Sequence, residues 1–198
     1  MARRATRSST CSERLSDEPD PVTRLRTRGA IERLIRDVPD FPRPGIVFKD
    51  ITPLLRDADG LRMACDGLAA AWRRERIDLV VGIESRGFIF GAPVALALGA
   101  GFTLARKQGK LPGRTQGARY ALEYGEAEIE MQSDAVAPGQ RVLLVDDVIA
   151  TGGTAAATVS LVRQLGGVMA GTSFLIELAF LHGRKALDGL RVEALLRY

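Results

Sequence analysis

Arg141-Val-Leu-Leu-Val-Asp-Asp-Val-Ile-Ala-Thr-Gly-Gly-Thr154 is the stretch of this 198-residue chain that decides its fold. Its apolar residues 142–145 have the composition of a strand buried on both faces of a parallel sheet. Asp146 and Asp147 follow at the expected carboxyl end of that strand, where open α/β sheets place their ligands. The stretch therefore predicts an α/β fold with a polar site at one edge of its sheet.

The turn that follows has the composition of a phosphate site. Gly152 and Gly153 carry no Cβ, so the backbone can turn tightly and approach an anion closely. Thr151 and Thr154 offer hydroxyls beside the unpaired N–H groups of an expected helix N-terminus. Two acids for sugar hydroxyls beside a phosphate seat indicate a pocket for a ribose 5-phosphate.

Two simpler interpretations of the same stretch compete with this one. A hydrophobic strand that ends in acids also occurs in P-loop nucleotide hydrolases, but these need a G-x-x-x-x-G-K-[ST] loop. Gly109-Lys110-Leu111 does not fit that loop, because the spacing is wrong and the hydroxyl is missing. Alternatively, the acids only solvate a strand end and the glycines only form a turn.

Length and composition predict one globular enzyme-sized domain. Apolar residues make up 46% of the chain and charged residues 26%, which is ordinary for a soluble protein. No apolar run approaches the ~20 residues that span a bilayer. Cys11 and Cys65 lie far apart and form no metal or redox pair, and the single histidine argues against a His-rich zinc site. These features favour a cytoplasmic protein with no membrane partner.

The net charge of +4 is concentrated at the N-terminus. Residues 1–28 hold seven arginines and four acids, a balance of +3, so the remainder is nearly neutral and carries no nucleic-acid footprint. This segment lacks apolar periodicity and is expected to be a disordered extension, with the domain over residues 29–198. An organellar presequence is the alternative, on its Arg- and Ser-rich start.

The order of the other patterns predicts a twisted, mainly parallel sheet with helices on both faces. We expect helices at 31–38, 58–76 and 87–98, and another after Thr154. We expect strands at 78–83, 102–105, 141–145 and 169–177, and a hairpin with arms 119–124 and 126–132. Alternation of strands and helices is typical of parallel α/β sheets.

Three further segments carry candidate binding residues. Glu84-Ser85-Arg86-Gly87 follows a buried strand, and an arginine there can bind phosphate oxygens with both arms of its guanidinium. Residues 105–113 form a basic, glycine-flanked loop that contains Arg106, Lys107 and Lys110 and leads on to Glu123 and Tyr124. Residues 40–53 form a proline-rich loop whose Phe48 can stack on a flat heterocycle. An exposed arginine, a solvated surface loop and a buried aromatic are the simpler explanations of these three segments.

Together these segments resemble the type I phosphoribosyltransferase family, and within it the enzymes that use adenine. The motifs are F-P-x-P-G-I-x-F-K-D-I-T-P, E-S-R-G-F-I-F-G, R-K-x-G-K-L-P-G, L-E-Y-G and the stretch that ends in A-T-G-G-T. The resemblance covers residues 30–198. Hypoxanthine-guanine enzymes carry an aspartate where this chain has Ala150, so the resemblance implies that the proton chemistry belongs to Glu123.

The resemblance implies transfer of a phosphoribosyl group from phosphoribosyl diphosphate (PRPP) to adenine, giving AMP and diphosphate in purine salvage, with Mg²⁺ as cofactor held mainly by PRPP and water. It implies a small hood and a flexible loop hairpin on the sheet, and a homodimer. It assigns catalytic roles to Glu123, Arg86 and Lys107 and adenine binding to Val47, Phe48, Lys49 and Leu178. It assigns PRPP binding to Ser85, Arg86, Arg106, Lys107, Lys110, Tyr124, Asp146, Asp147, Ala150, Thr151, Gly152, Gly153 and Thr154.

Two alternative functions remain open at this stage. One is an enzyme for another purine or a pyrimidine base. The other is a PRPP-sensing transcriptional regulator on the same fold, which would need a DNA-binding unit, and residues 1–28 are too short for a winged helix.

Overall fold

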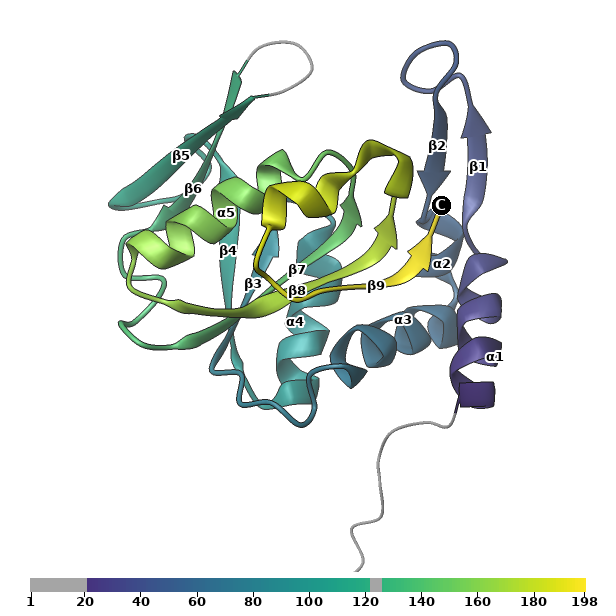
Figure 1. Ribbon diagram of the computed structural model, residues 1–198, viewed down its shortest axis with the longest axis horizontal. Helices are drawn as coiled ribbons and strands as arrows, with labels where there is room; N and C mark the ends of the chain where they lie inside the picture. Colours follow the sequence, from purple (N-terminus) through teal and green to yellow (C-terminus); the bar gives the residue numbers. More distant parts are fainter. Residues whose placement is uncertain (1–20, 122–125) are drawn as a thin grey trace, which may run out of the picture.

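One mixed sheet forms the centre of the molecule (Figure 1). The structure, a computed structural model, describes residues 21–121 and 126–198. The strands of the sheet are β3 (Leu79–Ile83), β4 (Gly101–Lys107), β5 (Thr115–Ala121), β6 (Glu126–Gln132), β7 (Arg141–Ile149), β8 (Val168–Glu177) and β9 (Val192–Arg197). Within the described residues these seven strands lie in the order β5-β6-β4-β3-β7-β8-β9. Strands β4, β3, β7, β8 and β9 are parallel, and the β5–β6 hairpin joins β4 antiparallel.

Helices cover both faces of this sheet, as the sequence predicts. On one face lie α1 (Pro21–Glu32), α3 (Ala58–Ala70) and α4 (Gly87–Leu98), and on the other lies α5 (Gly153–Gln164). Along β7 the side chains alternate: Leu143 and Val145 pack towards α3 and α4, whereas Val142 and Leu144 pack towards α5. This period of two is what a strand buried on both faces requires.

The order in which successive strands are added to the sheet reverses between β3 and β7. From β3 the chain passes through α4 to β4 on one side, and from β7 it passes through α5 to β8 on the other. Since β3 and β7 are neighbours, the loops that follow them leave the same edge of the sheet at a topological switch point. The fold therefore brings the 84–87 loop and the 150–154 turn together.

The hood is a separate antiparallel pair, β1 (Arg36–Pro39) and β2 (Val47–Asp50). The sequence-based prediction of a helix over residues 31–38 is wrong here, because the helix ends at Glu32 and the chain becomes extended. The proline at 39 disfavours helical backbone in the residue before it. Two cross-strand ion pairs, Arg36–Asp50 at 2.5 Å and Lys49–Asp37 at 2.7 Å, join the strands.

The expected N-terminal extension needs a corrected boundary. Residues 21–28 belong to α1 and are helical, so any extension ends before Pro21; residues 1–20 lie outside the described part. The helix has a mostly polar sequence, which explains why periodicity does not reveal it. It is held by burial of Ile31 against α3, so tertiary packing outweighs a weak local signal.

Other elements differ from the predictions in length or were not predicted. Strand β7 continues to Ile149, so the two acids lie within the strand rather than after it, and α3 stops at Ala70 rather than Arg76. The short helix α2 (Thr52–Arg56), the 3-10 turns η1 (Ala179–Leu181) and η2 (Gly183–Leu187) and strand β9 were not foreseen. No helix in the described ranges combines the length and apolarity needed to cross a bilayer.

Candidate functional site

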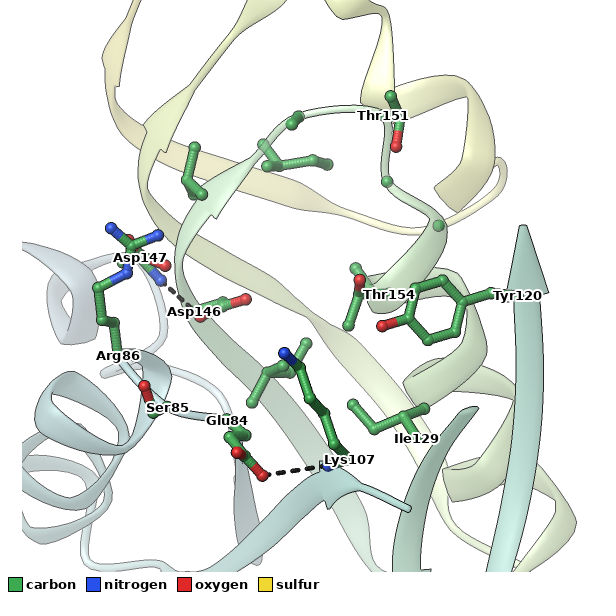
Figure 2. A pocket seen from close by; sticks show the side chains of 17 residues that line it. Glu84, Ser85, Arg86, Lys107, Tyr120, Ile129, Asp146, Asp147, Thr151 and Thr154 are labelled. Carbon is green, nitrogen blue, oxygen red and sulfur yellow. Dashed lines mark hydrogen bonds and ion pairs between the residues drawn. The ribbon is translucent and has the colours of Figure 1, made fainter. Parts of the chain in front are cut away.

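A cavity of about 230 Å³ opens at the switch point between β3 and β7 (Figure 2). Its lining comes from four segments that are far apart in the sequence: the 83–86 loop, Lys107 on β4, the β5–β6 hairpin, and residues 146–155. Among the predicted PRPP-binding residues, those that line it are Ser85, Arg86, Lys107, Asp146, Asp147, Ala150, Thr151, Gly152, Gly153 and Thr154. Most of the predicted PRPP site is thus one contiguous surface.

The two acids of β7 lie on one wall of this cavity. Asp147 is only 4% exposed, and its backbone N–H donates to Oδ1 of Asp146 at 2.9 Å. Burial, together with the neighbouring charge of Asp147, raises the pKa of Asp146 well above its ordinary value. Burial also raises the pKa of Asp147, against the opposing pull of Arg86. A buried and a half-buried carboxyl group held side by side favour a site that is completed by hydroxyl donors or by a cation.

Arg86 supplies the nearest cation to this acid pair. Its Nε lies 2.9 Å from Oδ2 of Asp147, so one buried charge is paired in the ligand-free protein. Arg86 also precedes α4, and Gly87 at the start of that helix lets the loop pack closely on β7. A Cβ on Gly87 would lie 2.8 Å from both Oδ1 of Asp146 and the Val145 carbonyl oxygen. The glycine of the E-S-R-G motif therefore sets the position of Arg86 relative to the acids.

Residues 150–154, which we call the phosphate cradle, form the opposite wall. Gly152 has φ +83° at the N-cap of α5, and this helix has no side-chain cap. The first N–H groups of α5 are thus left at the cavity end of the helix, where an anion gains most from them. The exposed Thr151 and the half-buried Thr154 bring their hydroxyls to the same wall.

The basic loop after β4 contributes one of its three cations to the cavity. Figure 2 shows the Lys107 side chain extending into it, while the Lys107 backbone N–H donates to Oε2 of Glu84 at 3.1 Å. Arg106 turns away, because its Nε donates to the same Glu84 oxygen at 3.2 Å and its Nη1 donates to the Lys110 carbonyl at 2.9 Å. Arg106 and Lys110 do not line the cavity, so their predicted contacts with PRPP remain predictions.

The residues predicted to bind a base lie beside this cavity rather than in it. Phe48 on β2 has its ring centroid 5.5 Å from Cζ of Arg86, so the hood reaches the cavity through that arginine. Leu178 follows β8, and its N–H donates to the carbonyl of Ile149, which lines the cavity, at 3.0 Å. Lys49 pairs with Asp37 and lies 3.9 Å from the centroid of the Tyr198 ring. Val47 on the same strand is exposed.

Two predicted residues cannot be located, and among the cavity residues that were not predicted two, Glu84 and Tyr120, carry polar side chains. Glu123 and Tyr124 fall in residues 122–125, outside the described part of the chain. Tyr120 and Glu84 line the cavity without a predicted role, and Tyr120 faces Thr154 across it. Glu84 opens the E-S-R-G-F-I-F-G motif, and Tyr120 falls in the predicted hairpin arm over residues 119–124. The alternation of Ala118 and Tyr120 along β5 would have placed Tyr120 on the inward face.

A second cavity of about 540 Å³ lies between α1, α3 and β9 and contains none of the motif residues. Its charged lining includes Asp66 and Arg73, which pair at 3.6 Å, and Arg191 and Glu193, which pair at 2.8 Å. Although this second cavity is larger, these charged side chains pair with one another, as on an ordinary protein surface. The first cavity is therefore the candidate site.

Comparisons with known proteins agree with this geometry. Residues 55–188 match the family model of the phosphoribosyl transferase domain. The chain is 56% identical over 169 residues to an adenine phosphoribosyltransferase of Anaeromyxobacter dehalogenans, covering 85% of this chain and 98% of that one. It is 57% identical over 165 residues to that of Thermobifida fusca, covering 83% and 94%.

Solved structures give the same result. The crystal structure of adenine phosphoribosyltransferase from Rhodothermus marinus superposes with a TM-score of 0.84 at 51% identity, covering 88% of this chain and 99% of that one. The Saccharomyces cerevisiae enzyme, solved with adenine and an imino-altritol bisphosphate, superposes with a TM-score of 0.82 at 41% identity, covering 87% and 99%.

Proposed function

The chain belongs to the phosphoribosyltransferase family, among its adenine phosphoribosyltransferases, and from this premise we propose how its own residues carry the reaction. The protein transfers the 5-phosphoribosyl group from PRPP to adenine, giving AMP and diphosphate, in purine salvage. The observation that supports our assignment of roles is the meeting of an acid pair, an arginine and a helix N-terminus in one cavity.

The cradle binds the 5-phosphate of PRPP. The first N–H groups of α5 and the hydroxyls of Thr151 and Thr154 donate to its oxygens, and the helix dipole favours its charge. Asp146 and Asp147 accept hydrogen bonds from the ribose hydroxyls. In this orientation the anomeric carbon lies between the cradle and Arg86.

Arg86 and Lys107 stabilise the charge that grows on diphosphate as the anomeric C–O bond breaks. Fixed cations in a site that excludes water are effective here, because they need no reorganisation during the reaction. Arg86 must share its guanidinium between Asp147 and the diphosphate, and its several donors allow this. Ser85 offers a hydroxyl from the same loop.

Mg²⁺ fits this site as an ion that PRPP binds and brings in. The described residues contain no cluster of three His, Cys, Asp or Glu side chains that could hold a metal alone. Arg86 pairs with Asp147, and Asp146 lies directly beside it, so the acid pair favours a cation brought in with the diphosphate. When bound, Mg²⁺ would neutralise phosphate charge. Asp146 and Asp147 would lie near it, with PRPP and water as its main ligands.

Adenine binds between the hood and the end of β8. Phe48 and Leu178 provide apolar surfaces for the ring, the backbone at Val47 recognises the exocyclic amine, and Lys49 lies beside it. The approach of Phe48 to Arg86 supports this arrangement, because it places the base next to the diphosphate loop. Glu123, with Tyr124 beside it, handles the proton of the base from the β5–β6 hairpin.

We propose that an exposed apolar stripe on α4 forms the contact between the subunits of a homodimer. Ile89 and Leu96 are 39% and 83% exposed and lie seven residues apart, so they share one face of the helix. Leu96→Glu should shift the protein towards monomer in light scattering if this face forms the contact, and an unchanged mass would exclude it. A cytoplasmic location is part of the same proposal.

The substrate assignment is tested by turnover. The purified protein is incubated with PRPP, Mg²⁺ and each of adenine, hypoxanthine and guanine, and nucleotide and diphosphate are measured. We expect AMP from adenine and little product from the others, since Ala150 takes the place of the aspartate of hypoxanthine-guanine enzymes. Comparable turnover of hypoxanthine or guanine would refute adenine specificity.

A further inference from the structure

An ion pair between the buried Glu177 and the exposed Arg184 lies behind the phosphate cradle and has no part in the chemistry described so far. Glu177 ends β8 and is 4% exposed. Arg184 on η2 donates to both of its carboxylate oxygens, from Nε at 2.7 Å and from Nη2 at 2.8 Å. The third nitrogen, Nη1, donates to the Val192 carbonyl on β9 at 2.7 Å. One side chain thus ties η2 to two adjacent strands of the sheet.

This pair is built for rigidity. A bidentate arginine–carboxylate pair is stronger and more directional than a single contact, because two parallel hydrogen bonds fix the relative orientation of the groups. These hydrogen bonds hold the pKa of Glu177 below its ordinary value. A second arginine, Arg197 on β9, approaches the same carboxylate only to 3.9 Å and does not touch η2.

The turn that Arg184 holds packs directly on the cradle. A Cβ on Gly152 would clash with the Gly183 carbonyl oxygen, and a Cβ on Gly183 would clash with the Ala150 carbonyl oxygen. The two backbones therefore approach as closely as two glycines permit. His182, at φ +53°, makes the bend that brings Gly183 to this position. In Figure 1 these turns lie beside α5, the helix that begins at the cradle.

We infer that Glu177, Gly183 and Arg184 form a brace that fixes the phosphate cradle in its PRPP-binding conformation. They are positioning residues: Gly183 contacts the outer side of the cradle, Arg184 and Glu177 hold the turn that carries Gly183, and none of the three lines the cavity. The cradle binds through backbone N–H groups, so its affinity depends on where the backbone lies, and few cavity side chains hold it there. The inference rests on the proposed role of residues 150–154 in binding the 5-phosphate.

The test compares two arginines that face one carboxylate. Arg184→Met removes the bidentate link to η2, whereas Arg197→Met removes a neighbouring charge and leaves η2 tied. We expect Arg184→Met to raise the dissociation constant for PRPP about 10- to 100-fold, the usual range for groups that orient binding residues. Arg197→Met should leave it within about twofold, and Arg184→Lys should recover part of the loss through a single hydrogen bond.

Gly183→Ala tests the same contact without changing any charge. It should weaken PRPP binding in the same way, because the new methyl group displaces Ala150. Melting temperatures are measured for every variant, since a merely structural role predicts lower stability with unchanged PRPP affinity in the folded protein.

Unchanged PRPP affinity in folded Arg184→Met and Gly183→Ala would overturn the brace. Gly153→Val, which alters the cavity wall itself, distinguishes failure of the brace from failure of the cradle assignment. If Gly153→Val abolishes PRPP binding while the brace variants do not, only the brace is refuted. If Gly153→Val also binds PRPP normally, the cradle assignment fails with it.

Discussion

The phosphate cradle and the hood lie beside the same cavity but are constructed in opposite ways. The cradle is backbone at the switch point of the sheet, between a buried strand and a helix, and packs on the turn at Gly183. The hood is two four-residue strands joined by cross-strand ion pairs, with Phe41, Ile46 and Val47 exposed. One region is packed into the core, and the other is a short surface hairpin with several exposed apolar side chains.

This difference matches the two ligands that we assign to them. PRPP carries charge that must be met by donors fixed in advance, since loosely held dipoles lose much of their effect. Adenine is flat and apolar on its faces, and a less rigid region can close on it. We therefore expect changes in the cradle to affect PRPP affinity severely, and changes in the hood to affect adenine with smaller loss.

The largest effect is expected from Gly153→Val. Gly153 lines the cavity at the first turn of α5, so a branched side chain there occupies the space of the 5-phosphate. PRPP binding should be abolished in calorimetric titration, while circular dichroism remains native-like. A folded variant that retains PRPP affinity would contradict the assignment of the cradle.

The next effect concerns Glu123, which belongs to neither region and falls in residues 122–125, outside the described part of the chain. Glu123→Gln keeps the shape of the side chain but cannot exchange a proton as a carboxylate does. We expect kcat to fall about 10²–10⁴-fold, with PRPP affinity little changed. Single-turnover rates with bound PRPP measure the chemical step. Near wild-type chemistry would leave Glu123 with a structural role only.

These two predictions depend on different kinds of sequence information. The fold and the cradle follow from local patterns: an apolar run, paired acids and a Thr-Gly-Gly-Thr turn determine strand, ligand edge and helix start. The alternation along β5 puts Tyr120 on the inward face but does not say which cavity that face meets, and the brace between Glu177 and Arg184 depends on tertiary contacts with no sequence signal. Likewise α1 packs against α3 but shows no apolar periodicity in its sequence. The sequence therefore predicts disorder for its first residues, where the structure has a helix.

The energetic cost of the acid pair opposite the cradle can be measured as a change in stability when Asp146 is replaced. Its pKa is raised above the ordinary value of 3.8, so the folded state holds this proton more tightly than the unfolded chain does. Stability from this group is lost as the pH rises from that value through the folded-state pKa. Asp146→Asn should therefore raise the free energy of unfolding at neutral pH, because the folded state no longer has to accommodate the charged carboxylate.

The control for this measurement is Asp134→Asn, which changes an exposed acid. Chemical denaturation at several pH values should show that the advantage of Asp146→Asn vanishes in acid and grows as the pH rises. A difference that does not vary with pH would mean that charge burial is not its source.

In the hood, Phe48→Ala should weaken the binding of adenine and leave the affinity for PRPP unchanged. Stacking of a base on an aromatic ring is worth about 1–3 kcal/mol, so we expect KM for adenine to rise about tenfold or more. The matched control is Phe41→Ala, because Phe41 is 52% exposed and meets Phe48 edge-on at 5.2 Å. An equal loss of PRPP affinity in Phe48→Ala would show that the hood and the cradle are coupled through Arg86.

The smallest effect is expected from removal of residues 1–20, which precede α1. Neither the cradle nor the hood depends on them in our assignment, so kcat/KM and melting temperature should stay close to those of the full chain. Removal of residues 1–28 is the informative contrast, because it also deletes eight residues of α1, including Thr27 and Arg28, which line the second cavity against α3 and β9. That longer deletion should lower the melting temperature while leaving the ratio of the two substrate KM values unchanged, since α3, against which α1 packs, contributes no residue to the candidate site. If the shorter deletion already reduces kcat/KM, the N-terminal segment contributes to the site, and the division of the cavity surroundings into a fixed cradle and an adjustable hood would need a third component.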